Sequence, residues 1–386
     1  MKNIALGTNR FGNVAPTEEA LSFSLIEKNN NQQIILVLSI NDSTVEHINL
    51  SESLKLNSHN PFHLFKNKSY ETLLSEINAL KINTTSIDYS DLIQPLKLNN
   101  QHLCAGLNYR DHIEESGQKS EYVLFPKYGE CFSHNLEIPV ENNTTLPELL
   151  DYEIELGLVF DHDIRTAKDV EGAHVGFLIC NDLSDRAPQV YFHTGNKKHL
   201  SYSFTAAKSK TEYSLVAPIL VIPRDWKSFS SNLEMSLFLN GELKQKSNTN
   251  KMTQTITDML QTALEFNSQS EWPLLGETPL ELSKNKKLKL LPQDQDSKFY
   301  LPANTLFMTG TPGGTLFQKP TQLELFLALI KIPFLKIDTS NLSFKEKLKL
   351  SLIHNWSNSG KYLKASDQIN SHIEKLGCLN FKVTKI

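Results

Sequence analysis

Two apolar stretches in the middle of the chain carry acidic residues at positions where buried strands are expected. The first covers residues 149–160 and contains Glu153 and Glu155, two positions apart. Because successive side chains of a strand point to opposite faces, this spacing places both carboxylates on one face. Two like charges on one face repel each other unless a cation lies between them. A fold that buries this stretch must therefore supply a positive charge there.

The second stretch, residues 175–180, is followed directly by Asn181 and Asp182. We expect it to form a neighbouring strand, which would bring a third carboxylate to the same place. Three oxygen ligands without a nearby Cys or His favour a hard cation over zinc, with Mg²⁺ first and Mn²⁺ or Ca²⁺ as alternatives. The spacing of Glu153 and Glu155 alone is also typical of the solvated face of an edge strand.

Composition limits the classes of protein to consider. The 386 residues include 39% hydrophobic and 21% charged residues, and the formal net charge is −4. This composition suits a globular protein, and the absence of a basic patch argues against nucleic acid as the main partner. The four cysteines form no C-x-x-C pair, which favours reduced thiols in a cytoplasmic protein: Cys104, Cys131, Cys180 and Cys378.

A membrane-spanning segment is not expected either. The longest apolar stretch, residues 323–335, contains Glu324, Lys331 and Pro333 and is too short to cross a bilayer. Residues 1–10 lack the apolar core of a signal peptide. We therefore predict a cytoplasmic protein without a membrane partner.

The pattern of the chain predicts two domains. Residues 1–95 are expected to form a small α/β unit, with a strand at 33–40 and a helix at 70–80. Residues 96–386 contain many short strands and few long helices, so we predict an α+β, mainly β fold. A largely helical, lysine-rich segment is expected at about 321–356, broken near Pro333. The chain is expected to close with a hairpin of two short strands.

A candidate acid/base pair follows another apolar strand. Residues 103–106 lead into a turn and a helix start that contains His112 and Glu115. Three positions apart on a helix, these side chains lie on one face within hydrogen-bonding reach. A carboxylate beside an imidazole fixes its tautomer and raises its basicity, as a general base requires. The alternative is a surface pair without a chemical task.

Six blocks in this order resemble the fumarylacetoacetate hydrolase family. The resemblance covers about residues 95–316 and the closing hairpin at about 361–386. The blocks are G-L-N-Y-R-D-H-x-x-E at 106–115, F-x-K at 125–127, D-Y-E-x-E-L at 151–156, N-D-x-S-x-R-x-x-Q at 181–189, A-K-S at 207–209 and T-G-T-P at 309–312.

The resemblance implies a mixed β-sheet roll, usually assembled as a homodimer, and assigns roles to individual residues. The implied metal ligands are Glu153, Glu155 and Asp182; the acid/base dyad is His112 and Glu115; the active-site lysine is Lys208; and the substrate contacts are Lys127, Arg186, Gln189 and Thr311.

The implied activity is metal-dependent hydrolysis of a C–C bond in a diketo acid such as an acylpyruvate or fumarylacetoacetate. A divalent ion can hold a 2-oxo acid and act as a Lewis acid, His112 can deprotonate water, and Lys208 can offset negative charge. A 2-oxo-acid lyase on the same site, such as an oxaloacetate decarboxylase or a sugar-acid dehydratase or isomerase, is an alternative. A non-catalytic binding protein of this fold is another.

The chain departs from the family at several places. Ala187 stands where many members have an acid, and Tyr128 replaces a common proline. Segments at about 268–300 and 317–360 are longer than in compact members. These departures leave the metal ligands in place, and they put the choice of substrate in doubt.

Overall fold

The structure is a computed structural model. It describes residues 11–80, 84–117, 122–134, 136–140, 146–193, 200–265 and 300–385. The expected extra segment at about 268–300 lies outside the described residues, except for its last position. The expected segment at 317–360 is described throughout.

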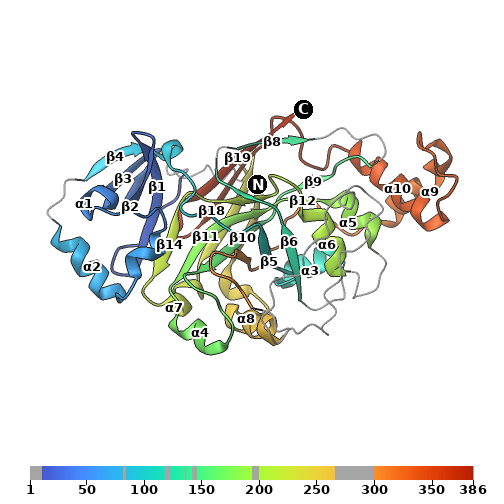
Figure 1. Ribbon diagram of the computed structural model, residues 1–386. Helices are drawn as coiled ribbons and strands as arrows, with labels where there is room; N and C mark the ends of the chain where they lie inside the picture. The colour runs from blue at the N-terminus through green and yellow to red at the C-terminus, as the bar shows by residue number, and fades with distance from the viewer. Residues whose placement is uncertain are drawn as a thin grey trace.

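Most described strands belong to one large mixed sheet (Figure 1). Its twelve strands within the described residues are β1 Ala20–Lys28, β2 Asn31–Asn41, β3 Thr44–Asn49, β4 Thr85–Asp88, β5 Gln101–Gly106, β6 Val123–Tyr128, β7 Cys131–Phe132, β10 Ile154–Phe160, β11 Val175–Asp182, β13 Ser214–Val216, β14 Leu220–Pro223 and β17 Phe307–Met308. They follow the order β4-β3-β2-β1-β14-β11-β10-β17-β5-β6, and β13 and β7 extend from β11.

The centre of this sheet is apolar on both faces. Every residue of β10 and β11 is buried, so these strands read as continuous hydrophobic runs rather than alternating ones. They pair antiparallel, with Ile154 opposite Asn181 and Phe160 opposite Val175. This register sets the end of β10 that carries the glutamates against the end of β11 that carries Asp182.

A second sheet lies over this core and gives the fold its rolled shape. Its strands are β8 Leu136–Val140, β15 Glu234–Leu239, β16 Glu242–Asn248, β18 Gln368–Ile373 and β19 Cys378–Lys385. Their order is β16-β15-β18-β19-β8, so the predicted closing hairpin, β18 with β19, is confirmed and lies inside a sheet. A short pair, β9 Leu150–Asp151 with β12 Ser184–Asp185, lies next to the acidic residues.

Residues from the N-terminal part extend the large sheet. β1 pairs with β14 through four residues, from Ala20 opposite Pro223 to Phe23 opposite Leu220. Phe23 also belongs to one buried cluster with Phe125 and Leu178 of the following part. The predicted boundary between residues 95 and 96 stays a prediction, but the sheet itself runs across it.

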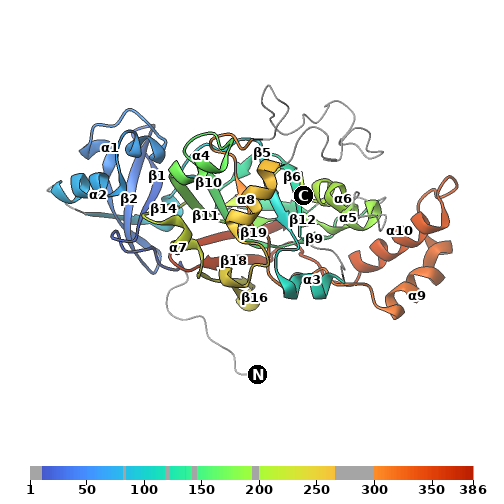
Figure 2. The same cartoon turned by 90° about the horizontal axis from the view of Figure 1, so that it is seen from below.

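Helices flank the sheets rather than forming a layer of their own (Figures 1 and 2). They are α1 Leu50–Ser53, α2 Tyr70–Ala79, α3 Arg110–Ser116, α4 Ala167–Gly172, α5 Arg186–Phe192, α6 Leu200–Lys208, α7 Trp226–Ser230, α8 Ile256–Glu265, α9 Gln322–Lys331 and α10 Phe344–Ser357. The predicted helical segment is confirmed as α9 and α10, and a 3₁₀ turn at Ile332–Phe334 interrupts it at Pro333. The α+β, mainly β class predicted from the sequence is also confirmed.

Tyr89 joins the N-terminal part to the closing hairpin, which yields a stability prediction. Its fully buried hydroxyl donates to the Cys378 carbonyl at 2.7 Å and accepts from the Cys378 amide at 3.1 Å. We expect Tyr89→Phe to lower the free energy of unfolding by about 1–3 kcal/mol, because two buried backbone groups lose their partner. Urea unfolding measures this difference.

Tyr362→Phe is the matched control. The Tyr362 hydroxyl is buried and has no hydrogen-bond partner among the described residues. Removing it should leave stability unchanged or slightly higher. Equal losses in the two variants would show that the Tyr89 hydrogen bonds contribute nothing specific.

Candidate active site

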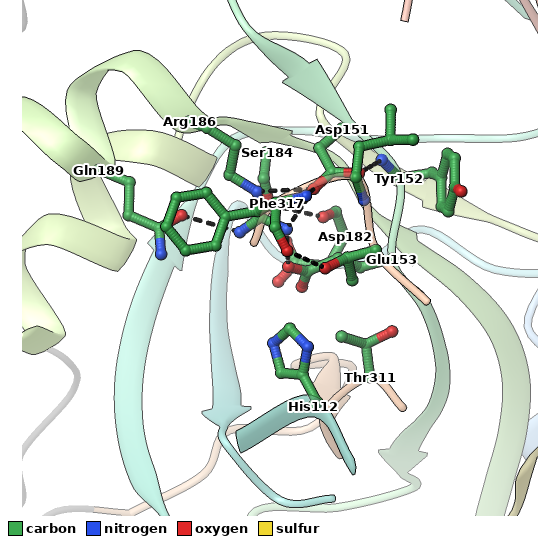
Figure 3. A network of polar contacts seen from close by, with 12 residues as sticks. His112, Asp151, Tyr152, Glu153, Asp182, Ser184, Arg186, Gln189, Thr311 and Phe317 are labelled. Atoms are coloured by element: carbon green, nitrogen blue, oxygen red, sulfur yellow. Dashed lines mark hydrogen bonds and ion pairs between the residues drawn. The ribbon is translucent and has the colours of Figure 1, made fainter. Parts of the chain in front are cut away.

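Three carboxylates meet where β10 and β11 lie side by side. Ligand oxygens of Glu153, Glu155 and Asp182 all lie within 4.8 Å of one another, and all three residues are buried. The Asp182 amide donates to the Glu153 carbonyl at 2.9 Å, which holds the two backbones together. The structure thus brings the three sequence-predicted ligands together, and Figure 3 shows Glu153 and Asp182 facing the centre of the site.

Two lysines hold this group from the side of β6 and α6. Lys208, the last residue of α6, places Nζ 2.5 Å from Glu153 Oε2 and 2.7 Å from Asp182 Oδ2. Lys127 in β6 pairs with the other Asp182 oxygen and donates to the Tyr213 carbonyl at 2.7 Å. Lys127 is fully buried, so it supports Asp182 from behind. Its expected contact with substrate stays a prediction.

Arg186 is bound on every side by protein groups (Figure 3). It donates to Asp151 at 2.8 Å, to Glu153 at 2.5 Å and to the side-chain oxygen of Gln189 at 2.8 Å. A guanidinium can only donate, so the Gln189 oxygen must face Arg186. The amide nitrogen of Gln189 is then left for another acceptor.

The charged groups of the site shift the pKa values of Glu153 and Glu155 in opposite directions. Burial raises the pKa of Glu153, but Lys208 and Arg186 outweigh it and lower that pKa to about 2. Burial and the neighbouring carboxylates of Asp182 and Glu153 raise the pKa of Glu155 well above its ordinary value. Glu155 receives one hydrogen bond, from the Gly310 amide at 2.8 Å, and joins none of the ion pairs found in the described ranges. The group therefore has a place for a further cation beside Glu155.

His112 and Glu115 form the predicted pair on α3. His112 Nδ1 lies 2.8 Å from Glu115 Oε1. Glu115 is also held by the Gly314 amide at 2.8 Å and the Thr315 hydroxyl at 3.0 Å. Burial raises the pKa of Glu115, but the hydrogen bonds from His112 and Gly314 outweigh it, so this pKa is lowered. With Nδ1–H donating to a carboxylate, the neutral ring presents Nε2 as its acceptor.

The loop after β17 donates hydrogen bonds to one carboxylate of the triad and to the carboxylate of the dyad. Gly310 has φ +97°, and a Cβ there would lie 2.9 Å from the Asn108 Cβ. Gly314 has φ +101°, and a Cβ there would lie 2.2 Å from the Lys244 carbonyl oxygen. Both positions need glycine. Their amides donate to Glu155 and Glu115, so this loop fixes one carboxylate of the triad and one of the dyad.

Most predicted site residues share one pocket. Its lining consists of Ala105, Gly106, Leu107, His112, Ser116, Phe125, Glu153, Glu155, Arg186, Gln189, Phe204, Lys208, Thr311 and Phe317. Three predicted residues act from outside this lining: Glu115 behind His112, and Lys127 and Asp182 behind Lys208.

Three residues that shape the site have no role predicted from the sequence. Asp151 accepts from Arg186 and from the Leu316 and Phe317 amides, and its place in the D-Y-E-x-E-L block was a usable signal. Gln245 donates to Thr311 Oγ1 at 3.0 Å and accepts from the Ile154 amide at 3.1 Å. Phe317 lines the pocket. No local pattern marks these last two, since their contacts are distant in sequence.

Comparisons with known proteins agree with this architecture. Residues 101–268 match the family model described as fumarylacetoacetate (FAA) hydrolase C-terminal. An uncharacterized protein of Methanocaldococcus jannaschii is 28% identical over 204 residues, which cover 50% of this chain and 78% of that protein. The mitochondrial oxaloacetate tautomerase of Rattus norvegicus is 28% identical over 180 residues, 45% of this chain. The chain spans about half of the rat protein's length, 53%.

Solved structures share the fold over nearly the whole chain. A fumarylacetoacetate hydrolase from Exiguobacterium antarcticum matches 95% of this chain and 100% of its own, with a TM-score of 0.56 and 18% identity. A 2-hydroxyhepta-2,4-diene-1,7-dioate isomerase from Mycobacterium marinum matches 95% and 98%, with a TM-score of 0.53 and 17% identity. The predicted mixed β-sheet roll is thereby confirmed. Residues 101–268 of the chain therefore contain a domain of the fumarylacetoacetate hydrolase family.

Proposed function

We propose that the protein is a divalent-metal-dependent hydrolase that cleaves a C–C bond in an acylpyruvate-like diketo acid. The observation that carries this proposal is that His112 of the base dyad lines the same pocket as Glu153 and Glu155 of the acidic triad. Hydrolysis needs both a cation site for the 2-oxo acid and a base for water. The pocket combines these two requirements.

The donor set fits a hard dication. Glu153, Glu155 and Asp182 would hold it, because all three offer carboxylate oxygens and Glu155 has no cation partner in the described ion pairs. We propose Mg²⁺, with Mn²⁺ or Ca²⁺ as alternatives. When bound, the ion supplies Lewis acidity toward the adjacent carbonyl and carboxylate of a 2-oxo acid.

The remaining side chains divide the work of hydrolysis. His112 Nε2 takes a proton from water, and the hydroxide oxygen bonds to the distal carbonyl carbon. The C–C bond then breaks, its electron pair passes to the 2-oxo acid fragment, and His112 returns the proton to that fragment's carbon. Glu115 holds the ring in the required tautomer. The products are a carboxylic acid and a 2-oxo acid.

Charge and donor positions suggest how substrate is held. An ammonium has three N–H groups, and Lys208 uses two of them on Glu153 and Asp182, which leaves one for a substrate oxygen. Gln189, oriented by Arg186, offers its amide nitrogen to a carboxylate, and Thr311 lies in the same lining. We propose that Arg186 and Lys127 act on substrate through the groups they hold.

A second candidate is enolisation without bond cleavage. The rat relative is an oxaloacetate tautomerase, and a solved structure of this fold is an isomerase. The same pocket could support it, since His112 needs only to move a proton between carbon and oxygen of a held 2-oxo acid. A lyase would use the same residues of the pocket, whereas a non-catalytic binding protein would use none of them for chemistry.

We also expect the protein to be a cytoplasmic homodimer that does not bind nucleic acid.

Substrate choice separates these candidates. We expect acetylpyruvate with Mg²⁺ to yield acetate and pyruvate in equal amounts, while oxaloacetate is not decarboxylated. Quantifying both products by chromatography measures the first reaction, and CO₂ release measures the second. Oxaloacetate decarboxylation or tautomerisation without diketone cleavage would reject the hydrolase. Absence of Mg²⁺ binding by calorimetry would favour a non-catalytic protein.

The dyad is tested by Glu115→Gln. We expect kcat for diketone cleavage to fall by about 10²–10⁴-fold with little change in KM, because the base loses its carboxylate partner. A glutamine oxygen can still accept from the Gly314 amide, so the loop should stay in place. Glu114→Gln, the same change at the exposed neighbouring position, should leave kcat unaltered. An unchanged kcat in Glu115→Gln would remove the dyad from the reaction.

The metal site is tested by Glu155→Gln, which removes the one triad carboxylate that takes part in none of the described ion pairs. Without metal, we expect this variant to be at least as stable as the parent, because a neutral amide replaces a carboxyl group whose ionisation is already opposed by burial and by two neighbouring carboxylates. Mg²⁺ at 100 times its dissociation constant should stabilise the parent by about 2.7 kcal/mol and leave the variant unaffected.

Thermal unfolding with Mg²⁺ or with a chelator measures both effects. Asp163→Asn, an equal change at a half-buried position that is ion-paired with Arg165 away from the triad, is the control and should respond to Mg²⁺ as the parent does. A Glu155→Gln variant that Mg²⁺ stabilises as strongly as the parent would show that the ligand assignment is wrong.

A further inference from the structure

Exposed apolar side chains are concentrated in one segment. Nine large hydrophobic residues of the described chain are exposed, and eight of them lie between positions 323 and 344. The eight are Leu323, Leu325, Phe326, Leu327, Leu329, Ile330, Phe334 and Phe344, with exposed fractions from 37% to 77%. The ninth, Leu243, lies in β16. A patch of this kind on a protein surface usually marks a binding face.

The patch covers most of the surface of α9. Successive residues of a helix are about 100° apart, so the six exposed apolar residues of α9 span an arc of roughly 200°. Gln322, the first residue, is the single polar side chain within that arc. The opposite side of α9 packs on α10: Ala328 is buried, and Glu324 accepts from Trp356 at 2.8 Å. Figures 1 and 2 place this helical hairpin at the end of the molecule away from β1–β4, with α9 outermost.

Positive charge surrounds the patch. Residues 319–349 contain six lysines and three acidic residues, whereas the whole chain has a net charge of −4. Lys331 ends α9 and Lys336 follows the 3₁₀ turn, next to the exposed Phe334. A partner of the hairpin must therefore cover an apolar helix and tolerate or prefer positive charge at its rim.

A second copy of the chain fits these conditions poorly. Docking of α9 on the body of another copy needs an exposed apolar acceptor, and outside this hairpin the described residues offer Leu243 alone among large exposed hydrophobics. Pairing of α9 with α9 would bring the same lysine-rich rims together. Protein interfaces also carry about one hydrogen bond per 100–200 Å², and the α9 arc has almost no polar side chain to make one.

We propose that the hairpin of α9 and α10 docks on the surface of a lipid bilayer that contains anionic head groups. Leu and Phe side chains on one face with lysines beside them are typical of helices that lie in the membrane interface. Phe334 and Phe344 enter the same interface, and Lys331 and Lys336 contact the head groups. No helix of the described residues is long and apolar enough to cross a membrane. This proposal departs from the expectation, drawn from the sequence, that the protein has no membrane partner.

Vesicle co-sedimentation of the full chain tests the proposal. We expect the protein to bind phosphatidylcholine vesicles that contain phosphatidylserine, and to bind pure phosphatidylcholine vesicles more weakly. Phe326→Glu should reduce the bound fraction by at least about tenfold, because it places a charge in the centre of the apolar arc. Leu243→Glu, a similar change at the exposed position outside the hairpin, should bind as the parent does.

A charge variant tests the contact of the lysines with anionic head groups separately from the insertion of the apolar side chains. Lys331→Glu with Lys336→Glu should remove the preference for phosphatidylserine, whereas Lys251→Glu with Lys382→Glu, two exposed lysines elsewhere, should keep it. Circular dichroism confirms that each variant is folded. Equal binding of Phe326→Glu and the parent overturns the proposal. So does a parent that ignores vesicles but forms a dimer, by light scattering, that Phe326→Glu dissociates.

Discussion

The candidate active site depends on a near balance of buried charge. Within the described residues, four carboxylates come together, from Asp151, Glu153, Glu155 and Asp182, and three cations hold them, from Lys127, Arg186 and Lys208. Removing charges from water costs several kcal/mol each unless partners and hydrogen bonds compensate. All but one carboxylate have such a partner. The exception is Glu155, where a bound divalent ion would supply the missing positive partner.

The fold provides this arrangement through backbone pairing more than through side-chain packing. The register of β10 on β11 sets Glu153 beside Asp182, and the start of α5 delivers Arg186 at the end of the same strands. Asp151 connects α5 with the loop after β17, because it accepts hydrogen bonds from Arg186 and from the amides of Leu316 and Phe317. One buried carboxylate thus fixes both the arginine and the loop that closes the pocket.

Sequence patterns predict the candidate groups of the site but not the partners that hold them. The spacing of Glu153 and Glu155 predicts a shared face, and the i,i+3 spacing of His112 and Glu115 predicts a hydrogen bond that the structure contains. In contrast, the burial of Lys127 behind Asp182 depends on the strand order β11-β10-β17-β5-β6 across the sheet. Long-range strand pairing leaves no mark in a local pattern. The same reason explains why β1 could not be seen to continue the large sheet through β14.

The helical hairpin also contacts Phe317, a residue of the pocket wall. The Arg186 guanidinium lies 5.4 Å from the Phe317 ring centroid, and Phe317 packs edge-on against Trp356 of α10 at 6.1 Å. Trp356 in turn donates to Glu324 of α9. Contiguous packing of this kind holds the side chains in a single arrangement. Transmission of a signal would require an element that can adopt two different arrangements. We therefore assign the hairpin a positioning role at the site: it fixes the Phe317 ring, and with it the shape of the pocket beside Arg186 and Gln189.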